Sequence, residues 1–182
     1  MKTPVLTLTL LILSTNAFAV SQPEGTFASR TATWYFAESR EACLKSGGKP
    51  MGEDDEGGQK EEVKADEEEP MPVECVIPVD DTATVTRENG ELKLAITTWG
   101  SNTHSCNYEG KATLAGNVLT SEERIDDSED GKPRFCKVTV KYLDENTVTV
   151  DADAEACRWF CGARAWGLGI EKALRTDPKD VK

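Results

Sequence analysis

Six cysteines are the residues whose type and spacing offer the most chemistry in this sequence: Cys43, Cys75, Cys106, Cys136, Cys157 and Cys161. Thiolates can bind a metal ion, form a redox pair or oxidise to disulfides. A tetrahedral zinc site has little support, because the chain has one histidine, His104, and no C-x-x-C pair. An even cysteine count in an exported chain indicates disulfides, so we predict three bonds and no free thiol.

Cys157 and Cys161 belong to the most distinctive segment of the chain, residues 157–165. Redox dithiols generally have two intervening residues, whereas this pair has three. A bond between them would span one helical turn and constrain almost nothing, so we expect each to reach a different strand. Of the 15 possible pairings, we favour Cys43–Cys75, with Cys106 and Cys136 each bonded to one of Cys157 and Cys161.

Catalytic chemistry has little support in the sequence. With His104 as the only histidine and every cysteine expected to be oxidised, neither a Ser-His-Asp triad nor a Cys-His pair is indicated. We expect His104 to hydrogen-bond locally where a strand begins. Paired carboxylates of the glycosidase kind remain open in a chain with 33 acidic residues, but abundance does not establish their geometry. We therefore predict a protein that is not an enzyme.

Asp151, Asp153 and Glu155 have the spacing of the first ligands of a calcium loop. The sixth position is Ala156, where an EF-hand needs glycine, and the twelfth is Gly162, where it needs a bidentate glutamate. We therefore predict no metal site and no cofactor. Four aromatic residues could form a ligand platform, but we expect them in the core: Trp99, Trp159, Phe160 and Trp166.

The first 19 residues have the pattern of a secretory signal peptide. Lys2 precedes an apolar run, Val5–Leu13, and residues 17–19 form an A-x-A cleavage site before Val20. A membrane anchor is the alternative, but the run is about half of the roughly 20 residues that a spanning helix needs. We predict cleavage after Ala19 and a periplasmic or extracellular product without a membrane anchor.

Strong acidity limits the partners of the mature chain. The full chain has a formal net charge of −12, and losing Lys2 makes it more negative still. Nucleic acid and anionic membranes would repel such a protein, whereas a cationic partner would be attracted. The alternative is that the charge only maintains solubility.

The charge is concentrated in an insertion, residues 46–72. Between Glu53 and Glu69 there are ten acidic residues and two lysines. Such a segment buries too little apolar area to offset chain entropy, so we predict a disordered acidic loop. It lies between Cys43 and Cys75, and a bond between them would staple its base. Residues 176–182 read as a charged tail.

The remaining chain, residues 20–175, reads as a single β domain. Short alternating segments separated by turn signals, of which Asn89-Gly90 is the strongest, favour an all-β fold: a small antiparallel β-barrel or sandwich. Pro78 is expected to interrupt one strand. A short helix or turn is expected over 37–45. The predicted strands are 31–36, 73–79, 82–86, 92–99, 105–114, 118–124, 134–142 and 147–150, with a polar loop over 125–132.

Two segments resemble small secreted bacterial domains. They are a G-x-N-x-H-x-C stretch from Gly100 to Cys106 and a C-x-x-x-C-G-A-R-A stretch from Cys157 to Ala165. Together with Cys136 ahead of a strand, they make residues 92–170 similar to the periplasmic lysozyme-inhibitor-like proteins. In the membrane-bound lysozyme-inhibitor family, a serine and a lysine enter the enzyme cleft. That motif has no assigned counterpart here, so no inhibitory residue is carried over.

These observations lead to two hypotheses of different classes. The first is a secreted or periplasmic binding protein whose target is a cationic cell-wall hydrolase such as lysozyme, acting as an inhibitor or as an immunity factor. Electrostatic steering would accelerate such an encounter. The alternative is an envelope structural or stress protein without a hydrolase target.

Overall fold

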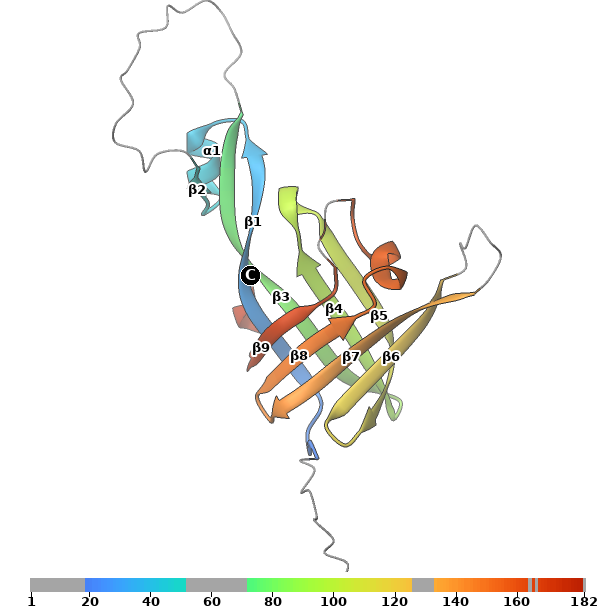
Figure 1. Ribbon diagram of the computed structural model, residues 1–182. Coiled ribbons are helices and arrows are strands. Elements are labelled where there is room, and N and C mark those ends of the chain that lie inside the picture. The colour runs from blue at the N-terminus through green and yellow to red at the C-terminus, as the bar shows by residue number, and fades with distance from the viewer. Residues whose placement is uncertain (1–18, 52–71, 126–132, 164, 166, 182) are drawn as a thin grey trace, which may run out of the picture.

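A computed structural model describes residues 19–51, 72–125, 133–163, 165 and 167–181 of the chain (Figure 1). Eight of the described strands form a closed antiparallel barrel in the order β1-β9-β8-β7-β6-β5-β4-β3, and pairing of β1 with β3 closes it. The predicted all-β fold with three disulfides is therefore confirmed, as a barrel. The elements are β1 (Gly25–Ala37), α1 (Arg40–Lys45), β2 (Lys49–Pro50), β3 (Val73–Glu88), β4 (Glu91–Trp99), η1 (Ser101–Thr103), β5 (Ser105–Ala115), β6 (Val118–Ile125), β7 (Arg134–Asp144), β8 (Thr147–Ala152), η2 (Ala156–Phe160), β9 (Ile170–Thr176) and η3 (Pro178–Asp180).

Alternation of apolar and polar residues forms the barrel interior. In β4, Leu92, Leu94 and Ile96 point inward and are buried, while the residues between them are more exposed. Successive strand residues face opposite sides of a sheet, which gives this period of two. The inward side chains of the other strands complete one core, in which Phe27 meets the ring of Tyr142 edge-on at 5.7 Å between centroids. Asn89 and Gly90, with positive φ of 50° and 87°, make the predicted turn between β3 and β4.

Three strand predictions need correction. Val73–Glu88 is one continuous strand, so Pro78 does not interrupt it. Pro78 pairs with Ala32 where β3 has β1 on one side and no barrel strand on the other, and an edge tolerates a residue without an N–H. β1 begins at Gly25, earlier than the predicted 31–36. β9 was not predicted at all.

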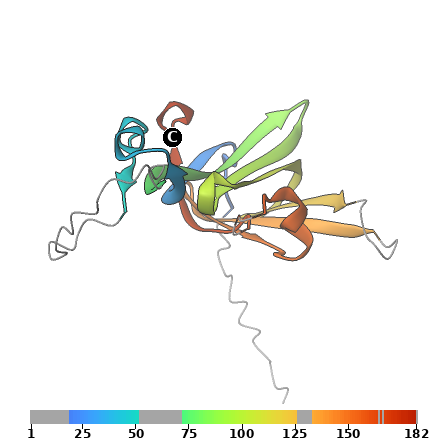
Figure 2. The ribbon, with the colours of Figure 1, turned by 90° about the horizontal axis from the view of Figure 1, so that it is seen from above.

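β1 and β3 extend beyond the barrel as a two-stranded ribbon. β1 pairs with β9 only through Thr26–Ala28, and β3 pairs with β4 only from Thr82 onward. The remaining residues, 29–37 and 73–81, pair with each other. Figure 1 shows this ribbon leading away from the barrel, with α1 and β2 at its tip, and Figure 2 shows that tip to one side of the barrel.

The ribbon tip has a small core of its own, made of Ala37, Cys43 and Cys75. The predicted Cys43–Cys75 disulfide joins α1 to β3, and α1 lies within the predicted 37–45. The predicted start of the acidic loop, residue 46, is too early, because residues 46–51 are structured. Lys49 and Pro50 pair with β3, and the Met51 N–H donates to the Glu74 carbonyl. The disulfide brings these residues to the strand edge.

Several predictions fall on residues outside the described ranges. They are the signal peptide over 1–18, the acidic stretch Glu53–Glu69 and the polar loop over 126–132. The C-terminal tail is described as far as Val181, and Pro178–Asp180 forms a 3₁₀ turn that the Asp177 carboxylate caps. No helix in the described ranges is both long and apolar enough to cross a membrane.

Candidate functional site

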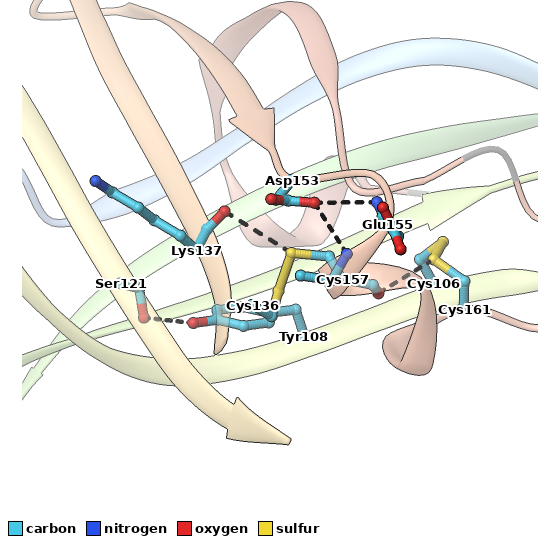
Figure 3. The surroundings of a disulfide bond; sticks show 10 residues. Cys106, Tyr108, Ser121, Cys136, Lys137, Asp153, Glu155, Cys157 and Cys161 are labelled. Atoms are coloured by element: carbon cyan, nitrogen blue, oxygen red, sulfur yellow. Dashed lines mark hydrogen bonds between the residues drawn. A yellow bond between two sulfur atoms is a disulfide. The ribbon is translucent and has the colours of Figure 1, made fainter. Parts of the chain in front are cut away.

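Two disulfides attach η2 and the residue that follows it to two strands of the barrel. Cys161 is bonded to Cys106 of β5, and Cys157 is bonded to Cys136 of β7 (Figure 3). The prediction that Cys157 and Cys161 reach different strands is thus confirmed. The described cysteines include no free thiol. Because η2 is tied on both sides, its position over this end of the barrel is fixed covalently.

The barrel is splayed where η2 lies. β5 and β6 pair over only four residues, from Ala112–Ala115 to Val118–Ser121. Beyond that point, β4–β5 diverges from β6–β7, and Figure 2 shows η2 between the two pairs. The ring of Phe160 packs edge-on against Tyr108, with 5.0 Å between centroids. The gap between the strands is therefore closed by side chains of η2 and β5 and by a single backbone bridge between Cys106 and Cys161, instead of by pairing of β5 with β6.

Tyr108 is buried at this junction and its polar tip is satisfied. Its phenol donates to the Ser121 hydroxyl at 2.8 Å, and that hydroxyl donates to the Lys111 carbonyl at 2.7 Å. Burial raises the pKa of Tyr108 above its usual value. The phenol therefore stays neutral at physiological pH and serves as a structural link between β5 and β6.

The 3₁₀ geometry of η2 separates its inward and outward residues. Residues three apart share a face of a 3₁₀ helix, so Cys157 and Phe160 point to the barrel together. Arg158 and Trp159 lie on the other side, and 58% of the Trp159 surface is exposed. The Asp153 carboxylate accepts hydrogen bonds from the N–H groups of Glu155 and Ala156, which fixes the start of the turn.

Arg134, Glu155, Arg158, Trp159 and Cys161 line a pocket of about 370 Å³ at this end. We call it the η2 pocket. Within the described part of the chain, neither guanidinium forms a hydrogen bond or an ion pair through its side chain. Arginine donates to carboxylates in a planar fork, and an indole face accepts apolar groups or cations. The pocket is therefore equipped to hold an acidic group beside an apolar surface.

The expectation that the four aromatic residues lie in the core is wrong for Trp159. Trp99 is half-buried and Phe160 packs against the core, while Trp166 lies outside the described residues. The signal for an exposed Trp159 was present in the cysteine spacing. If Cys157 and Cys161 both face the barrel, the residues between them include some that face solvent.

His104 takes no part in the η2 pocket. It follows η1, and its backbone N–H donates to the Ser101 carbonyl at 3.2 Å while its own carbonyl accepts from Gly100 at 2.7 Å. The local hydrogen bonding expected of His104 is thus made by its backbone. The Thr33 hydroxyl of the ribbon donates to the Gly100 carbonyl and accepts from the Thr103 N–H, which joins the ribbon to this loop.

The loop also contains two consecutive left-handed residues, Asn102 and Thr103, with φ of 55° and 56°. A β-branched residue rarely adopts that conformation. The contact with Thr33 holds it in place.

Asp151, Asp153 and Glu155, with the spacing of calcium ligands, have different surroundings in the structure. Asp153 caps η2, Glu155 lines the η2 pocket and Asp151 lies exposed at the end of β8. In the described ranges, no three acidic, histidine or cysteine side chains are grouped so that they could hold a metal ion.

Comparisons with protein-family models, with curated proteins and with solved structures found no match to this chain. The likeness of residues 92–170 to lysozyme-inhibitor-like proteins stays a prediction.

Proposed function

We propose that this chain is an exported, non-enzymatic binding protein whose target is a basic cell-wall hydrolase such as a lysozyme. It would act as an inhibitor or as an immunity factor against such an enzyme. The observation that carries the proposal is the exposed Trp159, which lies on a segment with two disulfide anchors and lines a pocket with Arg158 and with Arg134 of β7. Neither guanidinium is paired within the described part of the chain.

The chemistry of the η2 pocket is that of a protein-binding anchor. Tryptophan and arginine are the residues most enriched among those that dominate interface energetics. Trp159 and Arg158 lie on η2 between Cys157 and Cys161, and the two disulfides fix that segment, so little backbone ordering has to accompany binding. A rigid aromatic and two arginines at a barrel end suit insertion into a concave partner.

The charges fit a basic enzyme with an acidic cleft. The net charge of −12 would steer the chain toward a cationic protein, with the acidic stretch Glu53–Glu69 as the densest source. Glycoside hydrolases place two carboxyl groups about 5–10 Å apart in the substrate cleft. Arg134 and Arg158 could pair with such carboxylates, and Trp159 could occupy the apolar part of the cleft.

Export is the third part of the proposal. The signal-peptide pattern of the first 19 residues predicts it, and three disulfides in the described chain suit an oxidising compartment. Cell-wall hydrolases act in the same compartment, so the partner and the proposed binder would meet there.

The test is calorimetric titration of the mature protein, residues 20–182, against several types of lysozyme, with hydrolysis of cell walls measured in parallel. We expect binding to at least one basic enzyme. Trp159→Ala should weaken it at least tenfold, and so should Arg158→Ala. Leu174→Ala is the matched control, because Leu174 is 54% exposed but lies on β9 near the opposite end.

Two results would overturn the proposal. One is the absence of binding to every basic hydrolase tested, which would favour an envelope structural or stress protein. The other is binding that Leu174→Ala weakens as much as Trp159→Ala does.

A further inference from the structure

The residues that follow the predicted cleavage site fill the end of the barrel opposite η2. Val20 is only 7% exposed and belongs to the barrel core, whereas Ala19 before it is exposed. Pro23 is also buried, and its carbonyl accepts a hydrogen bond from the Tyr142 phenol at 2.7 Å. Residues 20–24 therefore form a plug, packed into the barrel ahead of β1.

Arg175 of β9 holds this plug through backbone carbonyls. Its guanidinium donates to the carbonyls of Gln22 at 2.9 Å and Glu24 at 2.5 Å, and its Nε donates to that of Glu145 at 2.9 Å. The space for it exists because residue 25 is glycine: a Cβ there would lie 2.2 Å from the guanidinium. Gly25 thus leaves room for the guanidinium that binds residues 22 and 24.

The Glu145 carboxylate lies beside Ser21, the second residue of the plug. One oxygen of Glu145, in the turn between β7 and β8, accepts from the Ser21 N–H at 3.3 Å and from the Ser21 hydroxyl at 3.1 Å. Its other oxygen has no hydrogen-bond partner among the described residues. A pocket of about 300 Å³ opens there, lined by Ser21, Gln22, Glu145, Asn146 and Arg175.

We propose that this pocket is a binding site for the α-ammonium group of Val20 that cleavage after Ala19 creates. The nitrogen of Val20 is one residue from that of Ser21, at most about 3.6 Å of chain, and the Ser21 N–H already donates to Glu145. In the uncleaved precursor the same nitrogen is an uncharged amide. Cleavage of the signal peptide therefore creates a cation that can pair with Glu145, and this ion pair stabilises the plug.

The charges around the pocket set the pH dependence of this ion pair. Glu145 lines it from the β7–β8 turn and Arg175 lines it from β9. Asp144 precedes Glu145 at the end of β7, and Glu24 is neutralised by its ion pair with Arg87 of β3. The proposal predicts that pairing with Glu145 outweighs the burial of Val20 and the Arg175 charge, which both lower the pKa of an amine, so the pKa in the folded state should lie above the ordinary range of about 7.7–8.0. The stabilisation is then fully present below that range and is lost as pH rises through the raised pKa.

The experiment is a double-mutant cycle on the mature protein. One arm compares the free α-amine with the Nα-acetylated chain, and the other compares the natural chain with Glu145→Gln. At pH 6.5 the free amine should raise the folding equilibrium constant about two- to fivefold when Glu145 is present, the range of a partly exposed ion pair. With Glu145→Gln the two N-terminal forms should be equally stable, and at pH 10 the difference should vanish in both.

A second readout is direct. The methyl resonances of Val20, followed by NMR, should titrate with a pKa above the ordinary range, and Glu145→Gln should return that pKa to it. Equal effects of acetylation with and without Glu145, an amine pKa within the ordinary range, or an exported chain that begins at a residue other than Val20 would each overturn the proposal. None of these outcomes concerns the hydrolase partner.

Discussion

At the η2 end of the barrel, two disulfides hold the chain across a gap between β5 and β6. At the opposite end, Arg175 and Tyr142 hold the plug through hydrogen bonds to its backbone carbonyls. Covalent closure leaves Arg158 and Trp159 free to face solvent. At the plug end, the polar side chains of Arg175 and Tyr142 are occupied by hydrogen bonds to the plug. The plug end therefore has fewer polar groups that could contact a partner.

The two ends of the barrel are therefore stabilised in different ways, and under the proposed function only the η2 end contacts a partner. We call the hydrogen bonds from Arg175 and Tyr142 to the plug the clasp. The clasp lies inside the fold, so its loss should lower the free energy of unfolding. The η2 end derives its rigidity from cysteines, and its outward side chains contribute little to folding. Four changes test this division, in order of decreasing expected effect on stability.

Removing the bond between β7 and η2 should have the largest effect. Cys136→Ala combined with Cys157→Ala should lower the free energy of unfolding by about 2–5 kcal/mol, the range found for native disulfides of small secreted domains. Urea unfolding without reductant measures it. The control variant removes the disulfide of the ribbon tip, by Cys43→Ala combined with Cys75→Ala. Its cluster is separate from the barrel core, so α1 should loosen while the main transition moves by less than about 1 kcal/mol. Equal losses from the two pairs would contradict the division.

Weakening the clasp should rank second. Arg175→Lys removes the planar fork that reaches three carbonyls and the contact of the guanidinium with the Phe27 ring, 4.7 Å from its centroid. We expect a loss of about 2–3 kcal/mol, since hydrogen bonds from charged donors are the stronger ones. Lys172→Ala, at an exposed position on the same strand, should change stability by less than about 0.5 kcal/mol. A similar loss for both would show that Arg175 acts only as a surface charge.

Deleting one hydroxyl of the clasp should rank third. Tyr142→Phe leaves the Pro23 carbonyl without its donor, at a cost of about 1–2 kcal/mol at pH 7. Burial raises the pKa of Tyr142 to about 12. Because the unfolded chain releases this proton near pH 10 and the folded chain does not, stability should fall between pH 10 and pH 12. Denaturant titrations across that range should show a shallower decline for Tyr142→Phe, and parallel curves would refute the assignment.

The smallest stability effect should come from the η2 pocket itself. The Trp159 side chain is exposed and forms no hydrogen bond within the described chain, so Trp159→Ala should shift the free energy of unfolding by less than about 0.5 kcal/mol. Thermal and urea unfolding measure this directly. A loss above 1 kcal/mol would mean that the indole supports the barrel and that reduced binding by this variant reflects damage to the fold.

The barrel strands were predictable where local signals agree. β4 has strict alternation, and Asn89-Gly90 marks the turn before it. β9 was not predictable, because its buried residues, Ile170 and Ala173, are three positions apart, whereas the buried residues of a regular strand are two apart. Its pairing with β8 shifts register between Val148 and Val150, which breaks the alternation that sequence patterns rely on.

The candidate site was only half predictable. The cysteine spacing already favoured bonds from Cys157 and Cys161 to different strands, and the structure confirms this. The position of Arg134 beside Arg158 depends on the bond between Cys136 and Cys157, one of several pairings that the sequence left open. The plug could not be foreseen, because Val20–Glu24 has no strand or helix pattern and its burial depends on Tyr142 and Arg175, more than 110 residues away.

Amide hydrogen exchange on a complex with a basic lysozyme tests the central claim most directly, that the η2 end recognises the partner while the plug end closes the fold. The account predicts added protection in residues 156–161 and at the start of β7 when the enzyme binds, with no change in residues 20–24 or in the β7–β8 turn. Protection confined to the plug end, with η2 exchanging as in the free protein, would contradict it.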